Sequence, residues 1–108
     1  MENFRTYQLA VTFFHECQKI ILHGPAKNQF DRAVLSIVLN LAEGSAKPSA
    51  KERRKFYFIS RGSFQEVKAI MQLYPHETKS LYKTSDILGA HLYKLCKNGK
   101  QAAGFYRC

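Results

Sequence analysis

The stretch RAVLSIVLNLAEG, residues 32–44, reads as one helical segment that is apolar at nearly every position. Its apolar residues recur at steps of three and four, which places their side chains on one face of a helix. Asn40 falls on the side expected to be buried. Because an unpaired buried amide would cost about 1 to 3 kcal/mol, we expect Asn40 to have hydrogen-bond partners and to fix the register of this helix.

The partners expected for Asn40 are Arg32, Glu43, Glu66 or backbone groups of the following helix. A related structural role is expected for Gly62 and Ser63, because small residues let two helices approach closely. A glycine inside a helix costs about 1 kcal/mol relative to alanine, and close packing is the expected compensation. Ser36 is placed to face this pair.

A first helix is expected over about residues 3–22, with Gly24 and Pro25 ending it. Its expected buried row is Phe4, Tyr7, Val11, Phe14, Gln18 and Ile21. A second helix begins with Asn28 as its cap and stops at Gly44, where glycine can adopt a left-handed conformation. The apolar side of the second helix is Phe30, Ala33, Val34, Ile37 and Leu41.

The third helix has the clearest start, because Ser49 and Glu52 stand three residues apart in the pattern of a capping box. Pro75 ends it. Its expected buried row is Phe56, Ser60, Ser63, Val67, Ile70 and Tyr74. A fourth helix is expected over residues 78–97, with Leu81, Ser85, Leu88, Leu92 and Leu95 on one face.

Four such helices with short connections predict an all-α fold, an antiparallel up-and-down four-helix bundle over residues 1–97. Residues 98–108 show no periodicity and are expected to form a flexible C-terminal tail. A chain of 108 residues suits one domain. The longest apolar runs are too short for a bilayer, no signal peptide is visible, and three widely spaced cysteines suit reduced thiols. We therefore expect a soluble cytoplasmic protein with no membrane association.

The net charge of +9 is unevenly distributed. Residues 1–46 are neutral overall, whereas residues 47–68 and residues 79–107 each carry a net charge of +5. This asymmetry indicates a polyanionic partner. The candidate contact residues on and just before the third helix are Lys47, Lys51, Arg53, Arg54, Lys55, Arg61 and Lys68.

Arg54, Arg61 and Lys68 recur every seven residues and so form one stripe along the third helix. Such a row can follow a phosphate backbone, with guanidinium groups donating paired hydrogen bonds to phosphate oxygens. The alternative is that these charged residues have no partner and only form part of the solvated surface, as most charged runs do. Catalysis is not expected: the four histidines lack metal-ligand spacing, no glycine-rich phosphate loop occurs, and the carboxylates are scattered, so we predict no enzyme, no cofactor and no metal.

Residues 28–70 resemble the small four-helix-bundle proteins encoded within intervening sequences of bacterial 23S ribosomal RNA genes. The second-helix residues that carry the resemblance are Gln29, Arg32, Ala33, Ser36, Ile37, Asn40, Ala42, Glu43 and Gly44. The third helix adds Arg61, Gly62, Ser63 and Glu66. Arg53 departs from the pattern, since that position is usually apolar. The resemblance implies a homo-oligomeric ring, most often a pentamer, and a distant kinship with the accessory proteins of diversity-generating retroelements.

Two helices offer apolar residues beside their expected core rows, namely Leu9, Phe13 and Ile20 in the first and Tyr57, Phe64 and Met71 in the third. One bundle cannot easily bury both sets, so we expect these residues at a subunit interface. The alternative is a wide core-facing stripe.

Two functions of different kinds remain open. In the first, the protein is a basic homo-oligomer that binds structured RNA through the third helix without reading base sequence. In the second, it is an oligomeric scaffold for a protein partner. A steep loss of affinity with salt would favour the first.

Overall fold

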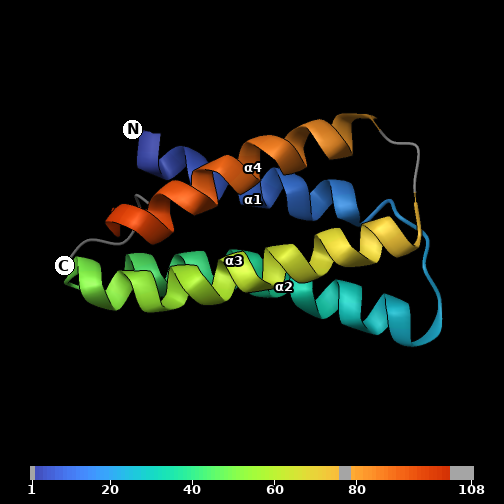
Figure 1. Ribbon diagram of the computed structural model, residues 1–108, viewed down its shortest axis with the longest axis horizontal. Helices are drawn as coiled ribbons and strands as arrows, with labels where there is room; N and C mark the ends of the chain where they lie inside the picture. Colours follow the sequence, from blue (N-terminus) through green and yellow to red (C-terminus); the bar gives the residue numbers. More distant parts are fainter. Residues whose placement is uncertain (1, 76–78, 103–108) are drawn as a thin grey trace.

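The computed structural model describes residues 2–75 and 79–102, and it places four helices in them. These are α1 (Glu2–Cys17), α2 (Gly24–Ser45), α3 (Ala50–Leu73) and α4 (Lys79–Asn98). Figure 1 shows α2 beside α3 in one layer and α1 beside α4 in the other. Each helix packs against two others, so the four enclose one core. The described residues contain no strand, and the predicted all-α, four-helix class is confirmed.

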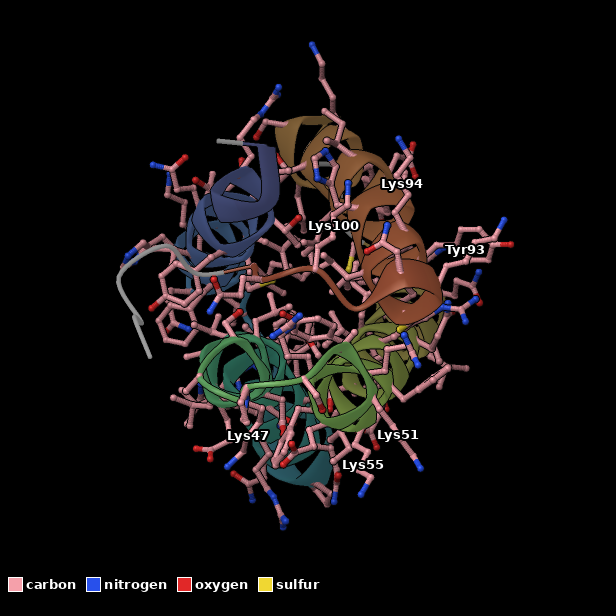
Figure 2. All side chains as sticks on the ribbon, turned by 90° about the vertical axis from the view of Figure 1, so that its left-hand side faces the viewer. Lys47, Lys51, Lys55, Tyr93, Lys94 and Lys100 are labelled. Carbon is pink, nitrogen blue, oxygen red and sulfur yellow. The ribbon has the colours of Figure 1, made fainter. Side chains whose placement is uncertain are left out.

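One end of the bundle brings together one end of each of the four helices (Figure 1). The first turns of α1 and α3 lie there, together with the last turns of α2 and α4 (Figure 1). We call this end the basic end, defined by Lys47, Lys51, Lys55, Lys94 and Lys100, which project from it in Figure 2.

The cap of α3 is confirmed. Ser49 is its N-cap residue, and its hydroxyl oxygen accepts a hydrogen bond from the amide of Glu52 at 3.2 Å. The same hydroxyl donates to the Glu52 carboxylate at 3.1 Å. At the other end α3 stops at Leu73, shortly before Pro75, as expected for a residue that cannot continue a helix.

The passage from α1 to α2 differs from expectation. The amides of Lys19 and Ile20 bond three residues back, which tightens and ends α1 after Cys17 rather than near residue 22. Gly24 does not end a helix but begins α2, with a φ of 61° and Pro25 in the first turn. Proline suits this place because the first helical amides have no intrahelical acceptor. Asn28 therefore lies inside α2 and is not its cap.

The far end of α2 also differs. Gly44 is buried within the helix, which continues to Ser45, so Gly44 is not a left-handed stop. A Cβ at Gly44 would lie 2.8 Å from the Cβ of Phe56 and 3.1 Å from the backbone oxygen of Arg53. Gly44 is needed because α3 crosses α2 closely at this point.

The buried faces of α2 and α4 are confirmed. The predicted residues of both helices are all buried, namely Phe30, Ala33, Val34, Ile37 and Leu41 in α2 and Leu81, Ser85, Leu88, Leu92 and Leu95 in α4.

The buried face of α1 is rotated from the expected one, and that of α3 is partly so: Ser60 and Val67 are buried as predicted, but the larger buried side chains lie one position further along. The core positions are Thr6, Ala10, Phe13 and Cys17 in α1 and Tyr57, Ser60, Phe64, Val67 and Met71 in α3. The rings of Phe13 and Phe64 meet at the centre, 5.9 Å apart. Ile21 and Tyr74, which we predicted to be buried, are exposed. Both helices have wide apolar surfaces, and the larger aromatic rings occupy the space between the layers.

The predicted subunit interface is therefore wrong in its residues. Phe13, Tyr57, Phe64 and Met71 are at most 4% exposed within a single chain. Leu9 and Ile20 are partly buried and pack against the same core. The wide core-facing stripe is the correct interpretation.

The predicted flexible tail does not begin at residue 98. Gly99, with a φ of 66°, turns the backbone toward the start of α3, and Ala102 is fully buried. The Ala102 amide donates to the hydroxyl oxygen of Ser45 at 2.7 Å and to that of Tyr57 at 3.1 Å. Residues 99–102 are thus part of the bundle, and the rest of the predicted tail lies outside the described residues.

Candidate nucleic-acid interface

Two of the seven predicted contact residues use their charged groups in hydrogen bonds or an ion pair within the chain. Arg53 is partly buried, and its guanidinium group donates to the backbone oxygens of Gly99 and Lys47. The side chain of Lys47 forms an ion pair with Glu43 at 3.1 Å and lies over the ring of Phe56. Arg53 therefore joins the α2–α3 turn to the segment after α4, which explains a cation where an apolar residue is usual. We remove it from the candidate site.

Lys51 and Lys55 are exposed in the first turns of α3. Figure 2 shows them projecting from the basic end on the side of α3. Positive charge in the first turn of a helix is unfavourable, because the aligned peptide dipoles make this end positive already. Their position therefore adds to the positive potential outside the molecule and does not stabilise the helix.

The stripe of Arg54, Arg61 and Lys68 runs along the side of α3 that faces α4. Arg61 lies over the ring of Tyr93 from α4, with its guanidinium carbon 5.3 Å from the ring centroid. Lys68 lies over the ring of Phe64 at 5.7 Å. All three stripe residues are partly buried, so their cations are held near the surface by the packing of their stems.

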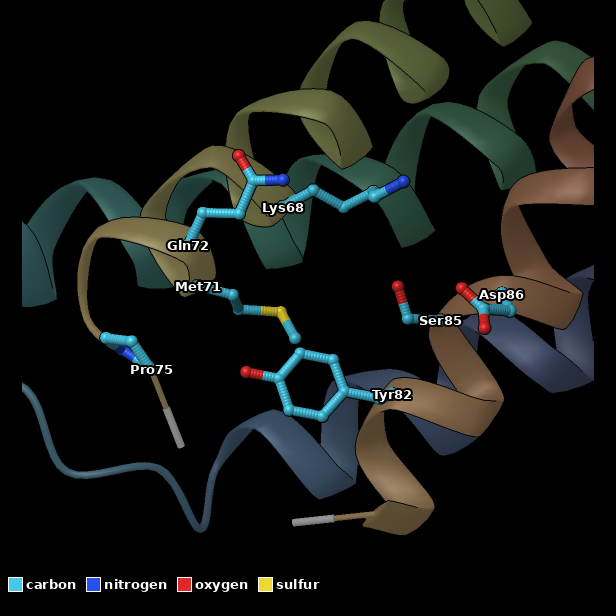
Figure 3. Close-up of a pocket in the computed structure, with 7 residues that line it drawn as sticks. All are labelled: Lys68, Met71, Gln72, Pro75, Tyr82, Ser85 and Asp86. Atoms are coloured by element: carbon cyan, nitrogen blue, oxygen red, sulfur yellow. The ribbon is translucent and has the colours of Figure 1, made fainter. Parts of the chain in front are cut away.

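A small cavity of about 210 Å³ lies at the end of this stripe that is farthest from Arg54 (Figure 3). Lys68, Met71 and Gln72 line it from α3, and Tyr82, Ser85 and Asp86 line it from α4. Figure 3 shows the thioether of Met71 directed toward the ring of Tyr82. Asp86 brings a negative charge to this end, which makes it less suited to a phosphate than the basic end.

The helix α4 contributes residues that the sequence interpretation did not place. Tyr93 is 52% exposed, and Lys97 approaches its ring to 5.9 Å. Lys94 is exposed on the same turns. The net charge of +5 over residues 79–107 indicated that this part of the chain is basic. The charge alone could not show that these side chains lie at the same end of the bundle as those of α3.

Three polar motif residues, Ser36, Asn40 and Ser63, lie partly buried at the α2–α3 contact. The hydroxyls of Ser36 and Ser63 are 2.7 Å apart, as the small-residue argument expected. Asn40 is only partly buried, and its amide donates to the backbone and side-chain oxygens of Ser36 at 2.9 and 3.0 Å. Its partner is thus one helical turn away and is not Arg32, Glu43 or Glu66.

Three other motif residues face solvent, whereas the motif residues Ala33, Ile37 and Gly44 are buried. Arg32, Gly62 and Glu66 are exposed, and apart from its chain neighbours and the backbone of its own helix, no described atom lies within 4 Å of where a Cβ on Gly62 would stand. A shallow polar cavity of about 340 Å³ lies between Gln29, Arg32, Ala33, Ser36, Ser63 and Glu66. The prediction that Gly62 packs closely against α2 is therefore wrong within one chain.

The described thiols are buried. Burial, and secondarily the charges of Glu16 and Asp31, raise the pKa of Cys17 to about 12. Burial also raises the pKa of Cys96. Since thiolates are the reactive and metal-binding form, neither group is activated. Within residues 2–75 and 79–102, no three His, Cys, Asp or Glu side chains are grouped to hold a metal ion. Nor does any helix there combine the length and apolarity that crossing a bilayer requires.

The fold and this surface define a class, a small four-helix protein with one strongly basic end. The family model described as 23S rRNA-intervening sequence protein matches residues 2–98. The chain belongs to that family, and the predicted membership is confirmed. No curated protein and no solved structure gives a significant match.

Proposed function

We propose that this protein binds structured RNA through the basic end and the adjoining side of α3, and that it acts by binding and not as an enzyme. The observation that carries the proposal is the set of cations with no acidic partner among the described residues: Lys51, Arg54, Lys55 and Arg61, joined by Lys94 and Lys97 of α4. The salt bridges that the described residues do form use Lys27 and Lys47 instead.

The chemistry of this surface suits phosphate more than bases. Lysine and arginine side chains neutralise backbone phosphates without reading sequence. A clustered positive potential also raises the rate at which a polyanion is captured. The buried thiols Cys17 and Cys96 suit a reducing setting, and we propose the cytoplasm as the place of action.

The test is fluorescence anisotropy with a structured ribosomal RNA fragment across a salt series. We expect log affinity to fall steeply and linearly with log salt concentration. The charge reversals Arg54→Glu and Arg61→Glu should each weaken binding by about tenfold or more. Lys19→Glu is the matched control, because Lys19 is exposed beyond the end of α1 at the opposite end of the bundle. Equal losses in all three variants, or no binding by the wild type, would exclude this surface.

We further propose that the antiparallel up-and-down bundle associates with copies of itself into a ring, with five subunits as the family resemblance implies. The outward sides of α2 and α3 support this, because Leu35, Leu39, Phe58 and Ile59 are 45 to 56% exposed there. The open position at Gly62 supports it too, since its cost to α3 is not offset by packing within one chain.

Sedimentation velocity tests this second proposal. We expect Ile59→Glu to shift the protein toward the monomer and Ile87→Glu, a matched change on α4, to leave the assembly unchanged. A monomeric wild type would exclude self-association. If the assembly forms but RNA is not bound, a scaffold for a protein partner becomes the better interpretation.

A further inference from the structure

A concave surface lies at the basic end, on the α1–α4 side of the bundle. It is a polar cavity of about 270 Å³ between the first turns of α1 and the last turns of α4. Its polar lining residues are Arg5, Thr6, His91, Lys94, Asn98 and Lys100. Figure 2 shows Lys94 and Lys100 coming from α4 and from the segment that follows it.

The cavity gathers three cations and, among the described residues that line it, no carboxylate. No described acidic side chain forms a salt bridge with Arg5, Lys94 or Lys100. Lys94 lies near the carboxyl end of α4, where the helix dipole favours a cation. Arg5 lies in the first turns of α1, where the dipole disfavours one, so helix stability does not explain its position. Three like charges around one concavity favour the binding of an anion.

Hydrogen bonds hold several residues that line the cavity in fixed positions. The backbone amide of Lys100 donates to the side-chain oxygen of Asn98 at 3.0 Å, and its carbonyl accepts from Tyr57 at 2.6 Å. Thr6 is 2% exposed, and its hydroxyl is 3.1 Å from Nδ1 of His91. The backbone that carries Lys100 and the ring of His91 are therefore positioned before a ligand arrives, which lowers the entropic cost of binding.

We propose that this cavity binds a phosphate group, with Arg5, Lys94 and Lys100 as its cationic ligands. A terminal phosphate offers several acceptor oxygens and up to two negative charges, which three converging cationic donors can satisfy. The cavity shares Lys94 with the RNA-binding surface proposed above, but none of its lining residues comes from α3. Failure of RNA binding at Arg54 and Arg61 would leave it intact, and its own failure would leave the α3 surface intact.

The experiment follows backbone amide chemical shifts of the full chain by NMR. Inorganic phosphate is titrated first, with sodium chloride at matched ionic strength as its control. A short RNA with a 5′-phosphate and the same RNA with a 5′-hydroxyl follow. We expect saturable shifts at residues 94, 98 and 100 with inorganic phosphate, and tighter binding of the phosphorylated RNA.

Two variants with the same change in charge distinguish phosphate binding at the cavity from general attraction by the positive charge of the protein. Lys94→Gln should weaken phosphate binding by about tenfold, the loss expected for one charge-assisted hydrogen bond. Lys83→Gln, on the same helix but outside both the cavity lining and the RNA-binding surface, should change it less than about twofold. Equal losses in both variants, or no saturable shift with any phosphate, overturn the proposal. If inorganic phosphate binds at the cavity but the two RNAs bind alike, the proposal holds with a free phosphate as the ligand.

Discussion

The hydroxyl of Tyr57 donates a hydrogen bond to the carbonyl oxygen of Lys100 at 2.6 Å, and so joins the core of α3 to the segment that follows α4. Tyr57 is fully buried, and its oxygen also accepts from the Ala102 amide and lies 3.1 Å from the hydroxyl of Ser45. A tyrosine is needed here because phenylalanine would fill the same space without a donor. The segment that follows α4 and the core thus share one polar group, the Tyr57 hydroxyl.

Tyr57→Phe is expected to lower the free energy of unfolding by about 1 to 3 kcal/mol, because the Lys100 carbonyl loses its donor. Chemical denaturation measures this loss. Tyr93→Phe is the matched control, because Tyr93 is half exposed and its change should stay within about 0.5 kcal/mol. A loss confined to Tyr93→Phe would contradict the role given to Tyr57.

Stability should decline above about pH 9 through Cys17. Burial raises the pKa of this thiol to about 12 from an ordinary value of 9.0, so the folded state holds the proton over an interval in which the unfolded state has released it. Its contribution is complete below pH 9 and is lost as the pH rises toward 12. The free energy of unfolding should fall by about 1.4 kcal/mol per pH unit from this group alone. Denaturation of Cys17→Ala over the same pH range should lack this component.

Gly44 and Gly62 should respond in opposite directions to alanine. Gly44→Ala is expected to cost about 1 to 3 kcal/mol, because the new methyl group would meet the Phe56 side chain and the Arg53 backbone. Gly62→Ala, in open space, should raise the free energy of unfolding by about 0.5 to 1 kcal/mol.

Both glycine variants are measured by denaturation, at protein concentrations low enough to favour separate chains. A Gly62→Ala variant that is less stable under those conditions would show a packing contact that the structure lacks. At high concentration the same variant should weaken self-association if α3 is part of the subunit interface.

The sequence was sufficient for the four helices and for the buried faces of α2 and α4, because each of these faces has one unambiguous apolar row. It was not sufficient for α1 and α3, where neighbouring rows are both apolar. Tyr57 shows why, since a fully buried tyrosine depends on partners from Ser45 and Lys100 that no local pattern predicts. Asn40 shows the reverse, because its partner was local and its side chain only partly buried.

The sequence predicted which charged residues belong to the candidate site, but it did not predict how they are arranged in space. Counting charges along the third helix found Lys51, Arg54 and Arg61, but it could not separate a cation used inside the chain from one that faces solvent. Nor could it place Arg5 beside Lys94, because 89 positions separate them in the sequence and only the packing of α1 against α4 brings them together.

Arg53 and Arg54 are adjacent in the sequence but are expected to have different roles, Arg53 in stabilising the fold and Arg54 in binding RNA. Arg53→Gln removes donors from the backbone oxygens of Gly99 and Lys47, and should lower the free energy of unfolding by about 1 to 3 kcal/mol. It should also make the segment after α4 more accessible to limited proteolysis, with RNA affinity changed less than about threefold. Arg54→Gln should do the reverse, weakening RNA binding by about tenfold while leaving stability within about 0.5 kcal/mol. Parallel denaturation and anisotropy measurements on the two variants test whether the two arginines have these different roles. An Arg53→Gln protein that is as stable as the wild type but binds RNA poorly would return Arg53 to the binding surface.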